Sequence, residues 1–153
     1  MLDPDREVEI VNALLNIYKR DGYMPDARSG NSNGRTQGGS NAEIVIADAF
    51  VKGLGMGNER DTIDYELALE AMLKDATTPP GGNEEAEGRG GLVPYLQYGY
   101  IPYGIPRAGN RTIEYAFCDY AIAEVAKGLG KEALALQYYK QAKNWQHLWR
   151  SDF

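Results

Sequence analysis

Polar side chains suited to ligand binding gather in a glycine-rich stretch, "GNSNGRTQGGSNAE", at residues 30–43. Its amides and its guanidinium are hydrogen-bond donors and acceptors and not nucleophiles, and the stretch lacks the Gly-Lys-Ser or Gly-Lys-Thr of a phosphate-binding loop. Glycine allows the backbone to approach a ligand closely. We expect either a site for hydroxyl groups or a polar loop that satisfies its own hydrogen bonds. The candidate residues are Asn31, Asn33, Arg35, Gln37 and Asn41.

Acidic residues form a second set of candidates. Glu114 is expected in the first turn of a helix, where it either favours the helix dipole or binds hydroxyl groups or a cation. Asp48 and Asp119 stand among apolar residues, and a buried carboxylate needs a partner. We therefore expect ion pairs with arginines of the loops, which are Arg28, Arg35, Arg89 and Arg111. The acidic run at 84–87 lacks the spacing of an EF-hand and is typical of a solvated loop.

Several kinds of chemistry are disfavoured by composition. His147 and Cys118 are the only residues of their types, so a His/Cys metal cluster and an internal disulfide are excluded, and a Ser-His-Asp triad is not expected. The aromatic neighbours of Cys118 predict a buried, inert thiol. The net charge of −6 argues against nucleic acid or an anionic membrane as the main partner. The first ten residues do not resemble a signal peptide, and no apolar run would span a membrane.

Five helices must position these residues. Apolar periodicity predicts amphipathic helices over 3–21, 63–75 and 131–149. Two further helices, over 41–52 and 112–127, are apolar on nearly every side, and we expect them to be buried on all sides. Connections of unusual length, at 22–39 and 76–111, lead into these two apolar helices, and long connections are often functional.

This alternation predicts an all-α fold of the (α/α) toroid type. If successive helices are antiparallel, the amphipathic helices form an outer layer, the apolar helices form an inner layer, and both long connections lie at one end. Five helices cannot close such a ring, so we expect a partial barrel. The alternative is an α-solenoid, because residues 126–142 resemble one helical hairpin of a tetratricopeptide repeat, but no 34-residue repeat is found.

Several blocks in order carry a more specific resemblance. They include "YMPDARSGNSNGRTQGGSNAEIVIADAFVKG", "YELALEAMLKDA", "EGRGGL", "YGYIP", "RTIEYAFCDYAIAEVAKGLG" and "NWQHLW". Together they resemble the helical domain of glycoside hydrolase family 92, the exo-acting α-mannosidases, and the fungal-type branch most closely. The resemblance runs over nearly all of the chain.

The resemblance implies an (α/α)6 barrel, of which residues 1–153 would be the N-terminal part, in a longer secreted protein with a preceding β-sandwich domain. It implies a role in carbohydrate metabolism, by hydrolysis of terminal α-mannosyl residues of glycans with inversion and with a bound calcium. Such hydrolysis needs an acid and a base. The family's acid lies in a Glu-Gly-Asn-Ala-Trp-Gln-like block and its base in an Asp-rich block, both expected beyond residue 153. "NWQ" at 144–146 is not that acid block.

We therefore expect no catalytic residue and no calcium ligand in this chain, and no turnover by the chain alone. Its own contribution would be to hold mannose hydroxyls or to shape the pocket. The alternative function is a non-catalytic helical interaction module of α-solenoid type. The candidate substrate-binding residues are Arg28, Asn31, Asn33, Arg35, Gln37, Asn41, Glu87, Arg89 and Glu114.

Overall fold

The structure is a computed structural model that describes residues 3–25, 40–57, 62–81 and 88–149. The described residues are helical and contain no strand, which confirms the predicted all-α class. The α-helices are α1 (Pro4–Asp21), α2 (Asn41–Val51), α3 (Tyr65–Thr77), α4 (Leu92–Tyr98), α5 (Ala108–Gly128) and α6 (Glu132–Gln141). A 3-10 helix, η1 (Asn144–Leu148), follows α6. Nowhere in the described ranges is a helix long and apolar enough to cross a bilayer.

Local signals in the sequence define α1. The Asp3 side chain accepts a hydrogen bond from the backbone N–H of Arg6 at 3.2 Å, and Pro4 takes the first helical position. The helix ends at Gly22, which has a left-handed φ of 84° and donates its N–H to Tyr18 O at 2.7 Å. Both ends of this helix agree with the prediction.

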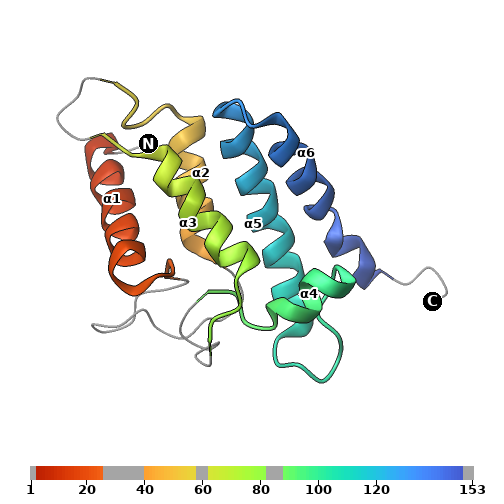
Figure 1. Cartoon of the computed structure of the whole chain (residues 1–153). Helices are drawn as coiled ribbons and strands as arrows, with labels where there is room; N and C mark the ends of the chain where they lie inside the picture. The colour runs from red at the N-terminus through yellow and green to blue at the C-terminus, as the bar shows by residue number, and fades with distance from the viewer. Residues whose placement is uncertain (1–2, 26–39, 58–61, 82–87, 150–153) are drawn as a thin grey trace.

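The helices alternate in direction. As Figure 1 shows, α2 and α5 run the same way, whereas α1, α3 and α6 run the opposite way. The two long connections leave α1 and α3 at the end of the molecule where α2 and α5 begin. We call this end the loop end. The prediction that both long connections lie at one end is confirmed.

Helix α5 organises the main core. It packs against α2, α3 and α6, and α1 packs against α2 and α3. The buried positions of α5 are largely small, which lets neighbouring helices approach closely, and they include Ala116, Ala121, Ala123 and Ala126. A smaller cluster joins α4 to the loop end of α5 through Leu92, Tyr95, Ile101 and Tyr115.

Several predicted boundaries were wrong. Helix α4 lies within the connection predicted to be irregular, where Gly91 and Gly99 flank only seven residues and the apolar pattern is too short to identify. Helix α5 begins at Ala108 and not at 112. The last predicted helix, 131–149, is divided, because α6 ends at Gln141 and the chain continues as η1.

The expectation that α2 and α5 are buried on all sides was also wrong. Each helix has an apolar stripe that no described residue covers. On α2 the stripe includes Val45 and Val51, with 37% and 68% of their surface exposed. On α5 it includes Ile113 and Phe117, each 53% exposed, and Tyr120, 47% exposed. We call these five residues the inner face.

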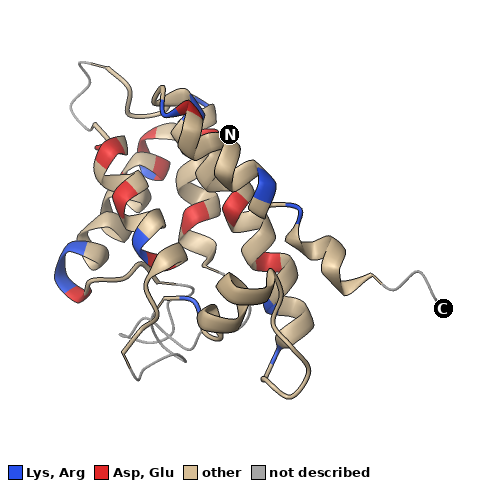
Figure 2. Cartoon of the chain, turned by 45° about the vertical axis from the view of Figure 1, so that its right-hand side comes forward, with Lys and Arg blue, Asp and Glu red and all other residues tan. Residues whose placement is uncertain are grey.

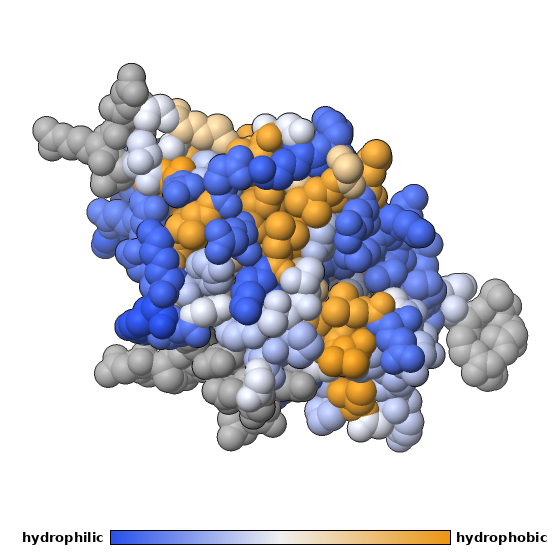
Figure 3. Space-filling model, in the orientation of Figure 1, coloured by the Kyte–Doolittle hydropathy of each residue, from blue (hydrophilic) through white to orange (hydrophobic). Residues whose placement is uncertain are grey.

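The outer side of the molecule, opposite the inner face, carries separate apolar areas and scattered charged residues. Figure 3 shows apolar areas in the upper centre and over α4, where Val93 and Leu96 are exposed. In the view of Figure 2, acidic and basic residues are scattered over the helices without a continuous basic band.

Candidate functional site

The structure describes three of the nine candidate binding residues. Asn41 is exposed at the first position of α2, and Glu114 is half-buried on α5, so both belong to the loop end. Glu114 stands in the second turn of α5, because this helix begins four residues earlier than predicted. The third, Arg89, is fully buried. The others lie outside the described residues, and they are Arg28, Asn31, Asn33, Arg35, Gln37 and Glu87.

Arg89 lies between the first turn of α2 and the middle of α5. Its Nη1 donates to Asp119 Oδ1 at 2.7 Å, and its Nη2 donates to Glu43 Oε2 at 2.8 Å. The guanidinium also lies over the ring of Tyr115, 5.2 Å from the ring centre. All three charged side chains are at most 1% exposed. Arg89 therefore binds two carboxylates in the interior and does not offer these donors to a ligand, contrary to the prediction.

A third carboxyl group, that of Asp75, adjoins this ion pair. Asp75 is in the last turn of α3 and is fully buried. Its Oδ1 accepts the backbone N–H of Met24 at 3.3 Å, and its Oδ2 accepts the hydroxyl of Ser40 at 2.9 Å. Arg89, Glu43, Asp75 and Asp119 together are called the Arg89 cluster below.

The Arg89 cluster holds more acid than base. Burial raises the pKa of Glu43 to about 7, although the charge of Arg89 opposes this rise. Burial and the charge of Glu43 likewise raise the pKa of Asp75 well above its ordinary range. One guanidinium can neutralise one carboxylate, and further unpaired negative charge in a low-dielectric interior is costly. Burial in the cluster therefore favours the protonated forms of Glu43 and Asp75.

Hydroxyl and thiol groups complete the surroundings of the cluster. The Tyr95 hydroxyl donates to Asp119 Oδ2 at 2.7 Å. Cys118 is fully buried, and its thiol donates to the Ser40 carbonyl at a sulfur–oxygen distance of 3.6 Å. Burial and the charge of Glu43 raise the pKa of the Cys118 thiol well above its usual value. This agrees with the predicted inert thiol.

Of the ion pairs predicted for Asp48 and Asp119, the structure contains one and not the other. Asp119 is buried and paired with a loop arginine, as expected. The prediction for Asp48 was wrong, because half of its side chain is exposed on the uncovered side of α2, beside the inner face, and it pairs with Lys52. Charge within an apolar run does not by itself reveal which side of a helix is covered.

Two members of the cluster, Glu43 and Asp75, were not among the residues predicted from the sequence. Glu43 looked like an ordinary acid in a first helical turn, where negative charge is favoured. Asp75 offered a usable signal, because an acid in the last turn of a helix opposes the helix dipole and so requires some other partner.

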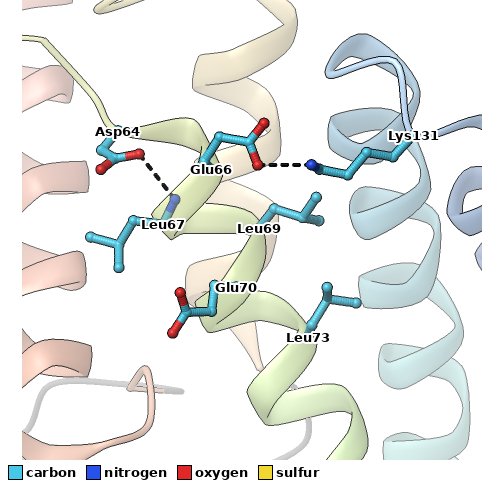
Figure 4. Close-up of a pocket in the computed structure, with 7 residues that line it drawn as sticks. All are labelled: Asp64, Glu66, Leu67, Leu69, Glu70, Leu73 and Lys131. Atoms are coloured by element: carbon cyan, nitrogen blue, oxygen red, sulfur yellow. Dashed lines mark hydrogen bonds and ion pairs between the residues drawn. The ribbon is translucent and has the colours of Figure 1, made fainter.

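An outward groove lies away from the loop end. Figure 4 shows it between the first turns of α3 and Lys131, which precedes α6. It encloses about 580 Å³ and is lined by Asp64, Glu66, Leu67, Leu69, Glu70, Leu73 and Lys131. Lys131 Nζ and Glu66 Oε2 form an exposed ion pair of 2.9 Å across it. The described candidate binding residues do not line this groove.

The described residues do not fit a calcium site. Calcium prefers six to eight oxygen ligands, usually several carboxylates. Among the residues that the structure describes, no three His, Cys, Asp or Glu side chains are arranged to hold a metal ion. Of the three buried carboxyls in the described ranges, Glu43 and Asp119 already contact Arg89, and Asp75 contacts Ser40 and Met24.

Comparison with solved structures shows a close match in shape. An inverting mannosidase of family GH92 from Bacteroides thetaiotaomicron superposes with a TM-score of 0.85 at 33% identity, covering 97% of this chain and 19% of the mannosidase. An α-mannosidase of the same family and species, solved in complex with mannoimidazole, gives a TM-score of 0.79 at 29% identity, covering 97% of this chain and 18% of that one. The predicted fold class, part of a helical barrel, is thereby confirmed.

A relative by sequence agrees with these structures. An uncharacterized secreted glycosidase from Arthroderma benhamiae is 43% identical, over 91% of this chain and 18% of the relative. The present chain thus spans about a fifth of the length of the relatives it matches. The glycosyl hydrolase family 92 catalytic domain matches residues 1–153, the whole of the chain. Family, fold and sequence agree, and the chain belongs to glycosyl hydrolase family 92.

Proposed function

We propose that this chain is part of the barrel of an exo-acting α-mannosidase that removes terminal α-mannosyl residues from glycans with inversion. The observation that carries the proposal is the match over 97% of the chain to an inverting mannosidase at 33% identity. A non-catalytic module of α-solenoid type is not favoured, because the same helices superpose on a glycosidase throughout.

The chain would form part of the pocket wall and would not transfer protons. An inverting hydrolase needs two carboxyl groups about 6.5–9.5 Å apart, with room for water between them. Glu43, Asp75 and Asp119 are buried and bound to protein groups, so none of them can reach a sugar. The family resemblance implies that the acid and the base lie in blocks beyond residue 153, so they would come from another part of the polypeptide.

Hydroxyl recognition would fall to the polar residues of the loop end. Asn41 and Glu114 are at this end, and amide and carboxylate groups both pair well with hydroxyls. The remaining candidates belong to the same proposal: Arg28, Asn31, Asn33, Arg35, Gln37 and Glu87. Calcium, which the family resemblance implies, would be held outside the described residues, and no step proposed here depends on it.

The inner face would be covered by further helices of the same polypeptide. A groove of about 220 Å³ runs between α2 and α5, and most of its lining is apolar: Ile44, Ala47, Asp48, Val51, Phe117, Tyr120, Ala121 and Glu124. Large exposed apolar areas usually mark an interface. The relatives are about five times as long as this chain, and a polypeptide of that length would have the residues to cover the groove. By analogy with the secreted relative, the protein would act outside the cell.

The test compares the 153-residue chain with a full-length polypeptide of this family that contains it. Each would be incubated with α-1,2-mannobiose and calcium, and the anomer of the released mannose followed by NMR. We expect turnover with release of the β-anomer by the long polypeptide only. Turnover by the short chain, or release of the α-anomer, would contradict the proposal.

A split version of the long polypeptide tests the inner face. Divided after residue 153, the two pieces should associate and recover turnover. Phe117→Glu should prevent association, because it places a charge in the groove. Leu136→Glu is the matched control, since Leu136 is 69% exposed on α6, outside this groove. Equal loss in both variants would show that the inner face is not the contact.

A further inference from the structure

The helices of this chain form an open row with two free edges. In Figure 1, α1 stands at one edge and α6 at the other, and α2, α3 and α5 lie between them. Helices that follow one another in a chain usually pack side by side. Polypeptide that continues beyond α6 would therefore extend the row at the α6 edge. Residues that cover the α1 edge would come from a more distant part of the polypeptide.

A wide groove follows the α1 edge, between the N-terminal half of α1 and helix α2. It encloses about 770 Å³ and is lined by Asp3, Arg6, Glu7, Ile10, Ile44, Val45, Asp48 and Lys52. Ile44 and Asp48 also line the groove between α2 and α5. Val45 belongs to the first groove and Val51 to the second, so the two grooves lie on opposite sides of the uncovered stripe of α2. We call the groove beside α1 the edge groove.

Two apolar side chains of the edge groove are left partly uncovered by the described residues. Ile10 of α1 is 48% exposed, and Val45 of α2 is 37% exposed. Side chains of one helix pack into the grooves between side chains of others, and an apolar groove commonly binds the apolar face of an amphipathic helix. The shape and the apolar lining of the edge groove therefore suit one further helix.

The charged side chains of the edge groove carry an excess of negative charge. Lys52 Nζ lies 3.9 Å from Glu7 Oε1 and also pairs with Asp48, so one ammonium group faces two carboxylates. Arg6, the other cation of the lining, pairs with Glu9 at 2.7 Å. A basic side chain on the covering helix would complement this charge.

We propose that the last helices of the barrel, from a part of the polypeptide beyond residue 153, pack into the edge groove and close the ring. The contacting helix would be amphipathic, with an apolar stripe against Ile10 and Val45 and a lysine or arginine opposite Glu7 and Asp48. The mannosidase that superposes on this chain is about five times as long, and a polypeptide of that length would have the residues to return to α1. The inference rests on the barrel fold and not on the mannosidase activity.

A photocrosslinker in the edge groove identifies its occupant. In the long polypeptide, Ile10→p-benzoylphenylalanine places a photoreactive ketone there, and mass spectrometry after irradiation and digestion identifies the attached peptide. We expect an intramolecular crosslink to the last helical hairpin of the barrel, at a peptide with Lys or Arg within one turn of the attachment. Arg20→p-benzoylphenylalanine is the matched control, because this exposed residue lies on the same helix about 15 Å further along. It should not give that product.

Other attached peptides would overturn the proposal. A crosslinked dimer would identify a second copy as the occupant. A peptide that precedes residue 1 would identify a different domain, and a peptide directly after residue 153 would place the next hairpin in the groove. Crosslinking no stronger than in the Arg20 control would show that the groove is open to solvent.

The second measurement compares the long polypeptide with the 153-residue chain. Ile10→Glu places a charge against the apolar stripe of the covering helix, so amides of α1 in the long polypeptide should exchange hydrogen about tenfold faster. In the 153-residue chain the same change should alter exchange less than about twofold, because Ile10 is already half exposed there. An equal effect in both would show that Ile10 acts within this chain, which would overturn the proposal. Neither measurement uses a substrate, so both results hold even if the long polypeptide turns over no mannoside and the proposed function fails.

Discussion

The guanidinium of Arg89 contacts two buried carboxyl groups, and a third buried carboxyl, that of Asp75, belongs to the same cluster. Burial and the surrounding negative charge raise the pKa of Glu43 and of Asp75, because each additional unpaired charge would have to be held without water. Burial alone would lower the pKa of Arg89, but Glu43 and Asp119 together raise it well above its usual value, so the arginine stays charged. The group of the cluster that gains or loses a proton is therefore a carboxyl group.

Glu43→Gln should flatten the pH dependence of stability. The pKa of Glu43 rises from 4.5 to about 7 on folding, so the folded chain binds a proton that the unfolded chain has lost over this range. This contribution to stability is fully present below pH 4.5 and is lost as the pH rises to 7. The variant should lose up to one proton of linkage, a slope of about 1.4 kcal/mol per pH unit. Urea unfolding at several pH values measures it.

Asp75 and an exposed glutamate provide the comparison. The pKa of Asp75 is also raised, so the variant should keep part of the wild-type slope. Glu66→Gln is the control, because this side chain is 63% exposed. The same slope in the wild type and in Glu43→Gln would show that Glu43 stays ionised throughout.

At the scale of helices, α2 and α5 cross closely at one position. A methyl group on Gly128, the last residue of α5, would meet the ring of Phe50 on α2. That ring is held edge-on against Tyr65, with ring centres 4.8 Å apart. Gly128→Ala should therefore lower the free energy of unfolding by about 1–3 kcal/mol, as overpacking does.

Thermal and urea unfolding measure the effect of Gly128→Ala. Adding Phe50→Leu to this variant shortens the opposing side chain, so it should recover part of the loss. The neighbouring exposed change Lys127→Ala is the control and should have little effect. A double variant that is no better than the sum of its single changes would exclude the contact as the cause.

The start of α3 depends on one side chain. Asp64 accepts the N–H of Leu67 at 3.0 Å, as Figure 4 shows, and so caps this helix. Asp64→Ala should cost about 1 kcal/mol of stability, and Asp64→Ser should retain most of it. The measurement is the urea midpoint at constant m-value. Equal losses in both variants would point to the charge of Asp64 and not to the cap.

Helices and their order could be predicted because periodicity and capping are local. The pattern of α1, with Asp3, Pro4 and Gly22, specifies both of its ends. The sequence could predict that Asp119 pairs with some arginine of the loops, since a buried charge requires a partner. The sequence does not show which arginine pairs with Asp119, or that Glu43 and Asp75 belong to the same cluster. These features depend on contacts between residues 30–51 positions apart, which spacing along one helix cannot reveal.

At the scale of the whole molecule, the inner face should cause the isolated chain to associate. Val45→Ser with Phe117→Ser should reduce this association and leave the helical circular dichroism unchanged, because both side chains are already exposed in the fold. Sedimentation velocity at increasing concentration measures it. Leu136→Ser is the control. A similar reduction by this control would indicate nonspecific hydrophobic association and not association through the inner face.

The side-by-side packing of α2 and α5 also has a consequence for synthesis on the ribosome. Helix α2 leaves the ribosome well before the helix that covers one of its sides. At typical elongation rates of about 5–20 residues per second, the roughly 60 residues between them take about 3–12 s to appear. During these seconds α1, α2 and α3 have no α5 to pack against, so the nascent chain exposes the main core. A pause in translation between α3 and α5 should therefore increase chaperone binding, whereas a pause after α6 should have less effect.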